Sequence, residues 1–210
     1  MVEERRAVAR PIVATPAGAE AAEFAALLAR VQVRDQAALG ELHDRAIGRV
    51  LALALRIVRV RADAEEVAID TFAQAWASAA DFDPRRGGAM AWLLTICRSR
   101  ALDLVRRRTS RANAEGGFAA EPAEDLAAAP EDLLGLAQGG SLLHAALREL
   151  SPERRQVLSL AYLRGYTQEE IAAFTGIALG TVKSHMRRAL GELREQLVLA
   201  GAGTHWSEGS

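Results

Sequence analysis

Residues 166–197 constrain the fold of this chain more than any other stretch. They read YTQEEIAAFTGIALGTVKSHMRRALGELREQL, in which two runs with helical spacing of apolar residues flank Gly176. Thr167 and Glu170 have the spacing of a capping box, in which the two side chains satisfy amides at the start of a helix. The pattern predicts two short helices joined by a glycine turn.

The second of these helices, taken to start near residue 181, has an apolar face and a basic face. On a wheel of about 3.6 residues per turn, the apolar face carries Val182, Met186, Leu190, Leu193 and Leu197. The polar face carries Lys183, Ser184, Arg187 and Arg194, flanked by His185 and Arg188. Arginine and lysine donate to guanine edges, and serine bonds phosphate or base. This arrangement predicts a helix-turn-helix whose second helix enters the DNA major groove.

Four further helices are predicted ahead of this motif. They start near residue 20 and near residues 36, 63 and 90, and the last three run to about residues 60, 80 and 108. Asp63 and Glu66 resemble a capping box for the third of them. Residues 81–88, DFDPRRGG, are predicted to be a loop because proline and paired glycines interrupt helices. Cys97 falls in the apolar stripe of the fourth helix, where a thiol behaves as a small hydrophobe.

Composition and charge separate two helical parts. Residues 98–111 hold six arginines and one acid, whereas residues 112–140 hold six acids and no base, although the whole chain carries a net charge of −1. Residues 109–140 are rich in Ala, Glu, Pro and Gly and are typical of a linker. We therefore predict an all-α protein of two small helical domains joined by a flexible acidic linker. The expected segments are a flexible leader at 1–19, a domain at 20–108, the linker at 109–140, a second domain at 141–199 and a tail at 200–210.

Several function classes find no support in the sequence. There is no apolar run of membrane-spanning length, no signal peptide, and a single cysteine, which excludes an internal disulfide and fits a reducing cytoplasm. The four histidines lack metal-ligand spacing, and no glycine-rich phosphate loop or nucleophile motif occurs. We expect no enzyme activity, no metal, no cofactor and no small-molecule substrate.

Two longer patterns resemble a known family. The stretch LRELSPERRQVLSLAYLRGYTQEEIAAFTGIALGTVKSHMRRALGELRE resembles region 4, the C-terminal DNA-binding region of bacterial sigma factors. DAEEVAIDTFAQAW and FDPRRGGAMAWLLTICRSRALDLVRRR resemble region 2 of the extracytoplasmic-function (ECF) subfamily. The two matches cover about residues 37–108 and 142–197, in family order and with no third domain between them. Ile69 stands where the family often has Gln, and Ser99 where it often has Asn.

The resemblance implies that the chain binds core RNA polymerase, directs it to −35 and −10 promoter elements and promotes DNA opening. In the family, the helix over residues 63–76 docks on the β′ clamp helices. The residues implied in polymerase binding are Glu65, Glu66, Ile69, Asp70 and Trp76, although Ile69 could instead widen the core stripe beside Trp76. The residues implied in −35 binding are Thr181, Lys183, Ser184, Arg187 and Arg188.

Residues 81–88 correspond to the family's specificity loop, which captures a flipped base of the −10 element. Flipping exposes the full edge of a base for reading. The implied −10 contacts are Asp81, Phe82, Asp83, Arg85, Arg86, Trp92, Arg98, Ser99 and Arg100. Phe82 could be a wall of the base pocket or a core plug, and we prefer the plug. Trp92 could stack at the edge of the DNA bubble or pack within the helical bundle. Arginine side chains in this region suit the phosphates of separating strands, and they are Arg98, Arg100, Arg106, Arg107 and Arg108.

The implied partners are core RNA polymerase, through its β′ clamp helices and β flap, promoter DNA, and an anti-sigma factor, often membrane-anchored in this family. The implied location is the cytoplasm. The alternative is a free-standing helix-turn-helix regulator whose front domain senses a ligand or dimerises. Such a regulator has no need of the region 2 signature or of the arginine cluster over residues 98–111.

Overall fold

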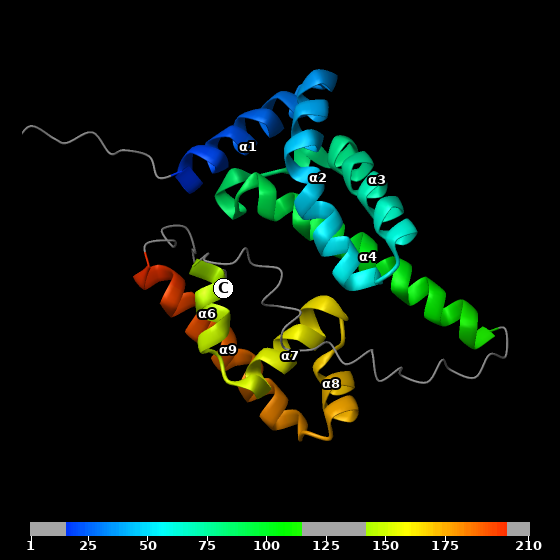
Figure 1. The fold of residues 1–210 in the computed structure, drawn as a ribbon, viewed down its shortest axis with the longest axis vertical. Helices are drawn as coiled ribbons and strands as arrows, with labels where there is room; N and C mark the ends of the chain where they lie inside the picture. The colour runs from blue at the N-terminus through cyan, green and yellow to red at the C-terminus, as the bar shows by residue number, and fades with distance from the viewer. Residues whose placement is uncertain (1–15, 115–141, 201–210) are drawn as a thin grey trace, which may run out of the picture.

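The computed structural model describes residues 16–114 and 142–200, which form two helical bodies (Figure 1). The first body contains α1 (Pro16–Gln32), α2 (Gln36–Val58), α3 (Arg61–Ser78) and α4 (Ala89–Ala114). The second contains α6 (Leu142–Glu149), α7 (Pro152–Leu163), α8 (Gln168–Thr175) and α9 (Leu179–Leu199). All regular elements in these ranges are helical, which confirms the all-α prediction. The predicted linker core and most of the leader and tail lie outside the described residues.

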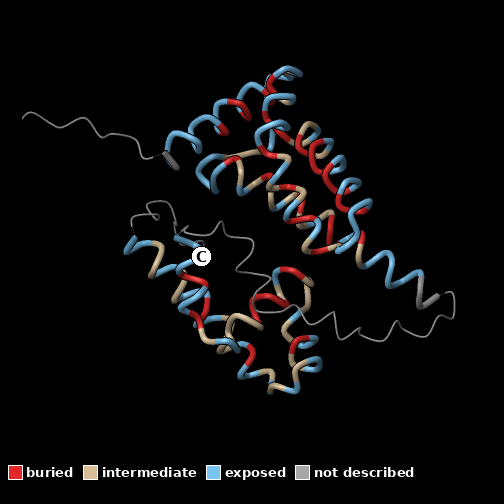
Figure 2. Tube along the Cα trace, in the orientation of Figure 1, coloured by how far each residue is buried: buried red, intermediate tan, exposed pale blue. Residues whose placement is uncertain are grey.

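The core of the first body lies where α2, α3 and α4 pack against one another, and buried positions line their facing sides (Figure 2). Val50, Val67, Leu93 and Cys97 are among its fully buried side chains. The Cys97 thiol lies 3.5 Å from the Val50 carbonyl oxygen and donates to it. Burial raises the pKa of Cys97 from an ordinary 9.0 to about 11. The cysteine is therefore a neutral core residue, as its place in the apolar stripe predicts.

The start of α3 differs from the prediction. The helix begins at Arg61 after Val60, which makes no side-chain cap, so the predicted capping box at Asp63 and Glu66 is wrong. Asp63 instead lies inside the first turn, 4% exposed, with its carboxylate paired to Arg108 of α4. A buried carboxylate needs a charged partner, and Arg108 provides one from a helix 45 positions away in the chain.

The connection between α3 and α4 is a loop built from two short 3₁₀ turns, η1 (Ala79–Asp81) and η2 (Pro84–Arg86). The Gln32 side-chain amide donates to the carbonyls of Ala79 (3.1 Å) and Phe82 (3.2 Å), which attaches the loop to the end of α1. Phe82 is half-buried against the core, with its ring 5.5 Å from that of Trp92. Both aromatic rings therefore pack on the bundle. For Phe82 this is the arrangement that the preferred interpretation as a core plug describes.

Local signals in the second body match the structure closely. Ser151 caps α7, with Pro152 in its first turn, and Thr167 and Glu170 form the predicted capping box of α8. Gly165 and Gly176 both have positive φ, 66° and 71°, and end α7 and α8. A positive φ is strained for residues with a Cβ, which explains why glycine stands at these two turns.

Candidate nucleic-acid interface

The helix-turn-helix is held together by a small apolar core of its own. Val157 and Leu160 of α7, Ile171 of α8 and Val182 of α9 are each 0% exposed and contact one another. An ion pair between Arg154 of α7 and Glu192 of α9 (2.5 Å) joins the outer helices. Since α9 is packed on one side against α7 and α8, its opposite side is presented as a fixed surface.

That opposite side of α9 is basic. Thr181, Lys183, Arg187 and Arg188 are exposed, and Ser184 is half-buried. Within the described part of the chain, no ion pair or hydrogen bond engages the side chains of Lys183, Arg187 or Arg188. Ala178, the N-cap of α9, offers no side-chain acceptor, and the Thr181 amide donates instead to the Ala178 carbonyl oxygen (2.8 Å). The five residues predicted to bind the −35 element thus lie within about two turns of α9.

One residue of the predicted apolar face is misplaced. Leu190 is 53% exposed, and Ala189 is fully buried in its stead. On the helical wheel Leu190 lies about 80° from Val182, whereas Ala189 lies about 20° from it. Leu190 was assigned to the apolar face because its side chain is hydrophobic, and that assignment is wrong. The small side chain of Ala189 suits the close approach of α9 to the rest of the body.

The candidate −10 residues fall into two groups. The first lies in the loop between α3 and α4, where Asp83 accepts from the Arg85 amide (3.0 Å) and pairs with its guanidinium (3.1 Å). The hydrogen bond from Arg85 lowers the pKa of Asp83 below its ordinary value. Asp81 and Arg86 are exposed beside them, and Trp92 packs under Phe82. The contacts between Asp83 and Arg85 therefore order the turn of the loop, while Phe82 packs on the bundle beside Trp92.

The second group lies along α4, and most of its arginines are already engaged. Arg100 donates to the Gln74 side chain, and Arg98 donates to backbone carbonyls of the second body. Ser99 and Arg107 are exposed. The structure therefore does not gather the candidate −10 residues on one surface, because Arg98 points away from the loop and toward α7.

The candidate polymerase-binding residues lie on the outer side of α3. Glu65, Glu66 and Asp70 are exposed, and so is Ile69, at 72%. The alternative that Ile69 widens the core stripe is therefore wrong. Trp76 is half-buried, with the guanidinium of Arg34 5.3 Å from its ring centre.

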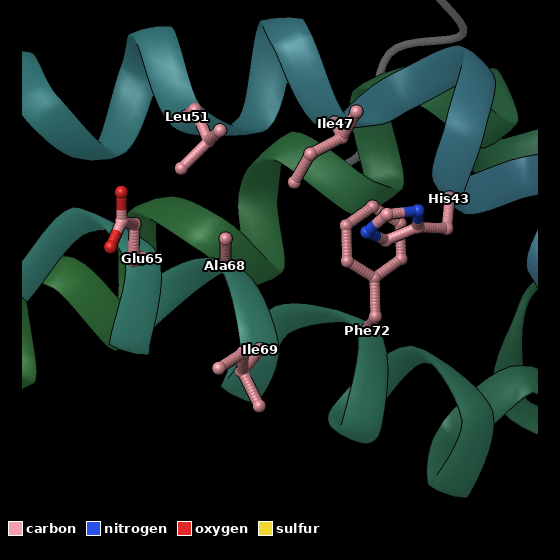
Figure 3. A pocket seen from close by; sticks show the side chains of 7 residues that line it. All are labelled: His43, Ile47, Leu51, Glu65, Ala68, Ile69 and Phe72. Carbon is pink, nitrogen blue, oxygen red and sulfur yellow. The ribbon is translucent and has the colours of Figure 1, made fainter.

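Ile69 forms one edge of a groove of about 400 Å³ between α2 and α3 (Figure 3). The groove is lined by His43, Ile47, Leu51, Glu65, Ala68, Ile69 and Phe72. Ile47 and Leu51 of α2 are only half-buried. The groove is thus an apolar surface with acidic residues beside it, and the sequence alone did not predict that His43 and the α2 residues line it.

Two kinds of site have no candidate here. None of the described helices is long and apolar enough to cross a membrane. Among the described residues there is also no cluster of three or more side chains suited to hold a metal ion.

Sequence comparisons with known proteins agree on one family. The model of sigma-70 region 2 matches residues 42–111, and that of sigma-70 region 4 matches residues 141–193. The ECF RNA polymerase sigma factor SigK of Mycobacterium tuberculosis (strain H37Rv) is 36% identical over 175 residues, covering 82% of this chain and 92% of that relative. SigK of Mycolicibacterium vanbaalenii is 34% identical over 182 residues, covering 85% and 91%. Among solved structures, CnrH in complex with the cytosolic domain of CnrY matches at 25% identity over 86% of this chain and 99% of that one, with a TM-score of 0.40.

Proposed function

The chain belongs to the ECF RNA polymerase sigma factors, and we propose that it binds core RNA polymerase, directs it to −35 and −10 promoter elements and promotes DNA opening. In this proposal the first body is the region 2 domain (residues 20–108) and the second is the region 4 domain (residues 141–199). The chain acts in the cytoplasm and has no catalytic site of its own, since the polymerase performs the chemistry.

The observation that carries the proposal is the uncompensated basic face of α9. Charged side chains on a protein surface usually have opposite charges nearby, yet Lys183, Arg187 and Arg188 are exposed and unpaired within the described residues. They project from a helix that is packed only on its other side. A rigid basic helix of this kind suits the major groove, where Arg and Lys read base edges and phosphates fix the register. We assign it to the −35 element.

The groove between α2 and α3 supports binding to the polymerase. Its lining is apolar around Ile69, and Glu65, Glu66 and Asp70 are exposed on the same helix. This combination fits a helical partner with an apolar ridge and basic flanks, and we assign it to the β′ clamp helices. The loop over residues 81–88, held at its base by Gln32, is assigned to the −10 element.

Run-off transcription with purified core polymerase tests the function as a whole. With promoter fragments from the source genome, the full chain should convert core polymerase into a promoter-specific enzyme. Tight sequence-specific binding by the chain alone, unaffected by polymerase, would favour the free-standing regulator instead.

The substitution Ile69→Asp tests the polymerase assignment. It should weaken binding to core polymerase about tenfold or more, because a charge then faces an apolar partner surface. Val33→Asp is the matched control, since Val33 is 78% exposed in the same domain and lies outside the groove. Equal losses in the two variants would refute the groove as the docking surface.

We also propose that an anti-sigma factor inhibits the chain by covering both domains at once. This rests on the family resemblance. Recovery of the chain from native cells, followed by competition with core polymerase, tests it. If none of the recovered partners competes with core polymerase for the chain, control must lie in expression or degradation.

A further inference from the structure

The two bodies contact each other through arginines that cap helix ends across the boundary. Arg98 of α4 donates to the carbonyls of Tyr162 (2.7 Å) and Ala161 (2.9 Å) in the last turn of α7. Its guanidinium also lies 4.8 Å from the centre of the Tyr162 ring. In the other direction, Arg164 after α7 donates to the Ile57 carbonyl (3.3 Å) in the last turn of α2. In Figure 1 the end of α7 accordingly lies beside the end of α2.

These contacts are chemically well matched. The last four carbonyls of a helix lack intrahelical partners, and the C-terminal end carries partial negative charge. A guanidinium placed there satisfies both needs. Since each body supplies an arginine to a helix end of the other, the two bodies satisfy each other's orphan carbonyls.

An apolar contact accompanies the arginines. Leu102 lies about 180° from Leu93 on the wheel of α4, on the side facing away from the core of the first body. It is nevertheless only 5% exposed. A Cβ added to Gly165 would lie 2.9 Å from the Leu102 side chain, so Gly165 packs directly onto it. Leu102 belongs to the same buried apolar cluster as Leu158 and Leu163 of α7.

We propose that these contacts form an autoinhibitory latch, defined as Arg98 and Leu102 of the first body against Tyr162, Arg164 and Gly165 of the second. The closed latch occupies the guanidinium of Arg98 and covers the α4 face around Leu102. Both lie in the arginine-rich stretch over residues 98–111, whose guanidinium groups suit the phosphates of separating DNA strands, so this inference rests on the proposed function in promoter opening. The free chain then binds single-stranded DNA weakly, and opening of the latch exposes the α4 surface.

Distance measurements on the full chain test the latch without reference to transcription. Spin labels on cysteines introduced at Ala73 of α3 and Ala173 of α8, both exposed, report the separation of the bodies in a Cys97→Ala background. We expect one narrow distance distribution for the parent chain and a broad one for Leu102→Gln and for Arg164→Gln. Leu199→Gln, at a site 87% exposed on α9, is the matched control and should leave the distribution narrow. A thermal unfolding curve for each variant verifies that both bodies remain folded.

Binding of a short mixed-sequence single-stranded oligonucleotide tests the inhibition. Opening the latch should raise the affinity roughly tenfold, as expected when the binding-competent fraction rises from about a tenth to nearly all. The slope of log affinity against log salt should steepen by about 0.7, corresponding to one added phosphate contact. Adding Arg98→Gln to Leu102→Gln should abolish both gains.

Each outcome decides one part of the proposal. A broad distribution in the parent chain, or no broadening in the Leu102→Gln and Arg164→Gln variants, overturns the latch. Broadening without a gain in DNA affinity overturns the inhibition. A latch that behaves as expected in a chain that fails to direct polymerase would instead refute the proposed function and leave the conformational result standing.

Discussion

The pair formed by Asp63 and Arg108 gives the sharpest test of how the region 2 bundle is stabilised. The Asp63 side chain is 6% exposed and that of Arg108 is 54% exposed, so the carboxylate is buried and the guanidinium reaches it from the surface. Both carboxylate oxygens of Asp63 face the Arg108 guanidinium, since Oδ1 accepts a hydrogen bond from Nη2 and Oδ2 pairs with Nη1. Replacing Arg108 by Ala therefore leaves a buried negative charge with no compensating cation.

Removing one partner of a fully buried ion pair costs about 3–5 kcal/mol. Because Arg108 is half-exposed and water can partly replace it, we expect the smaller cost of about 1–3 kcal/mol for Arg108→Ala. For a domain of this size each kcal/mol lowers Tm by about 4–8 °C, so the expected drop is roughly 10 °C. The double variant Asp63→Asn with Arg108→Ala should recover part of the loss, since no charge then remains buried.

Thermal unfolding followed by circular dichroism measures the effect. The matched control is Arg61→Ala, which breaks the exposed pair between Arg61 and Glu65 on the same helix. Exposed pairs of this spacing contribute about 0.3–0.5 kcal/mol, so Tm should fall by only a few degrees. If Arg108→Ala costs no more than Arg61→Ala, burial does not strengthen the dependence of Asp63 on its partner and the reasoning is wrong.

Three further predictions concern other parts of the chain. Because the folded chain keeps its Cys97 proton up to a pKa of about 11 while the unfolded chain loses it near 9.0, the free energy of unfolding should fall between these pH values by about 2–3 kcal/mol. Denaturant titrations across this range should show a larger loss in the parent chain than in Cys97→Ala, where the raised pKa of Tyr162 still contributes a loss in the same direction. Lys183→Ala or Arg187→Ala should reduce discrimination for the native −35 element by about 1–3 kcal/mol with core binding unchanged, measured by run-off transcription and a core-binding assay; unchanged promoter choice in both variants would contradict the −35 assignment. Gly176→Ala should cost about 1 kcal/mol in denaturant titrations, since a Cβ there meets nothing within 4 Å and only the φ of 71° is strained.

Much of the secondary structure followed from signals that act over a few residues. Ser151 and Thr167 cap their helices, and Gly165 and Gly176 end theirs, because each depends on the chemistry of its own turn. The exposed face of α9 was also predictable, since Lys183 and Arg187 recur at helical spacing beside a strong apolar stripe. The family followed from the residue patterns of both halves together.

Tertiary contacts decided what those local signals left open. Asp63 had the spacing of a cap, yet its carboxylate lies buried because Arg108 approaches it from another helix. Leu102 stood on the polar side of α4, yet it is buried because the second body covers it. Arg98 had the charge to bind DNA, and its direction depends on the carbonyls at the end of α7. A helix start is determined by neighbours three or four residues away. The buried charge of Asp63 and the carbonyl of Tyr162 instead find their arginine partners 45 and 64 positions away in the chain, and only the packed fold brings such segments together.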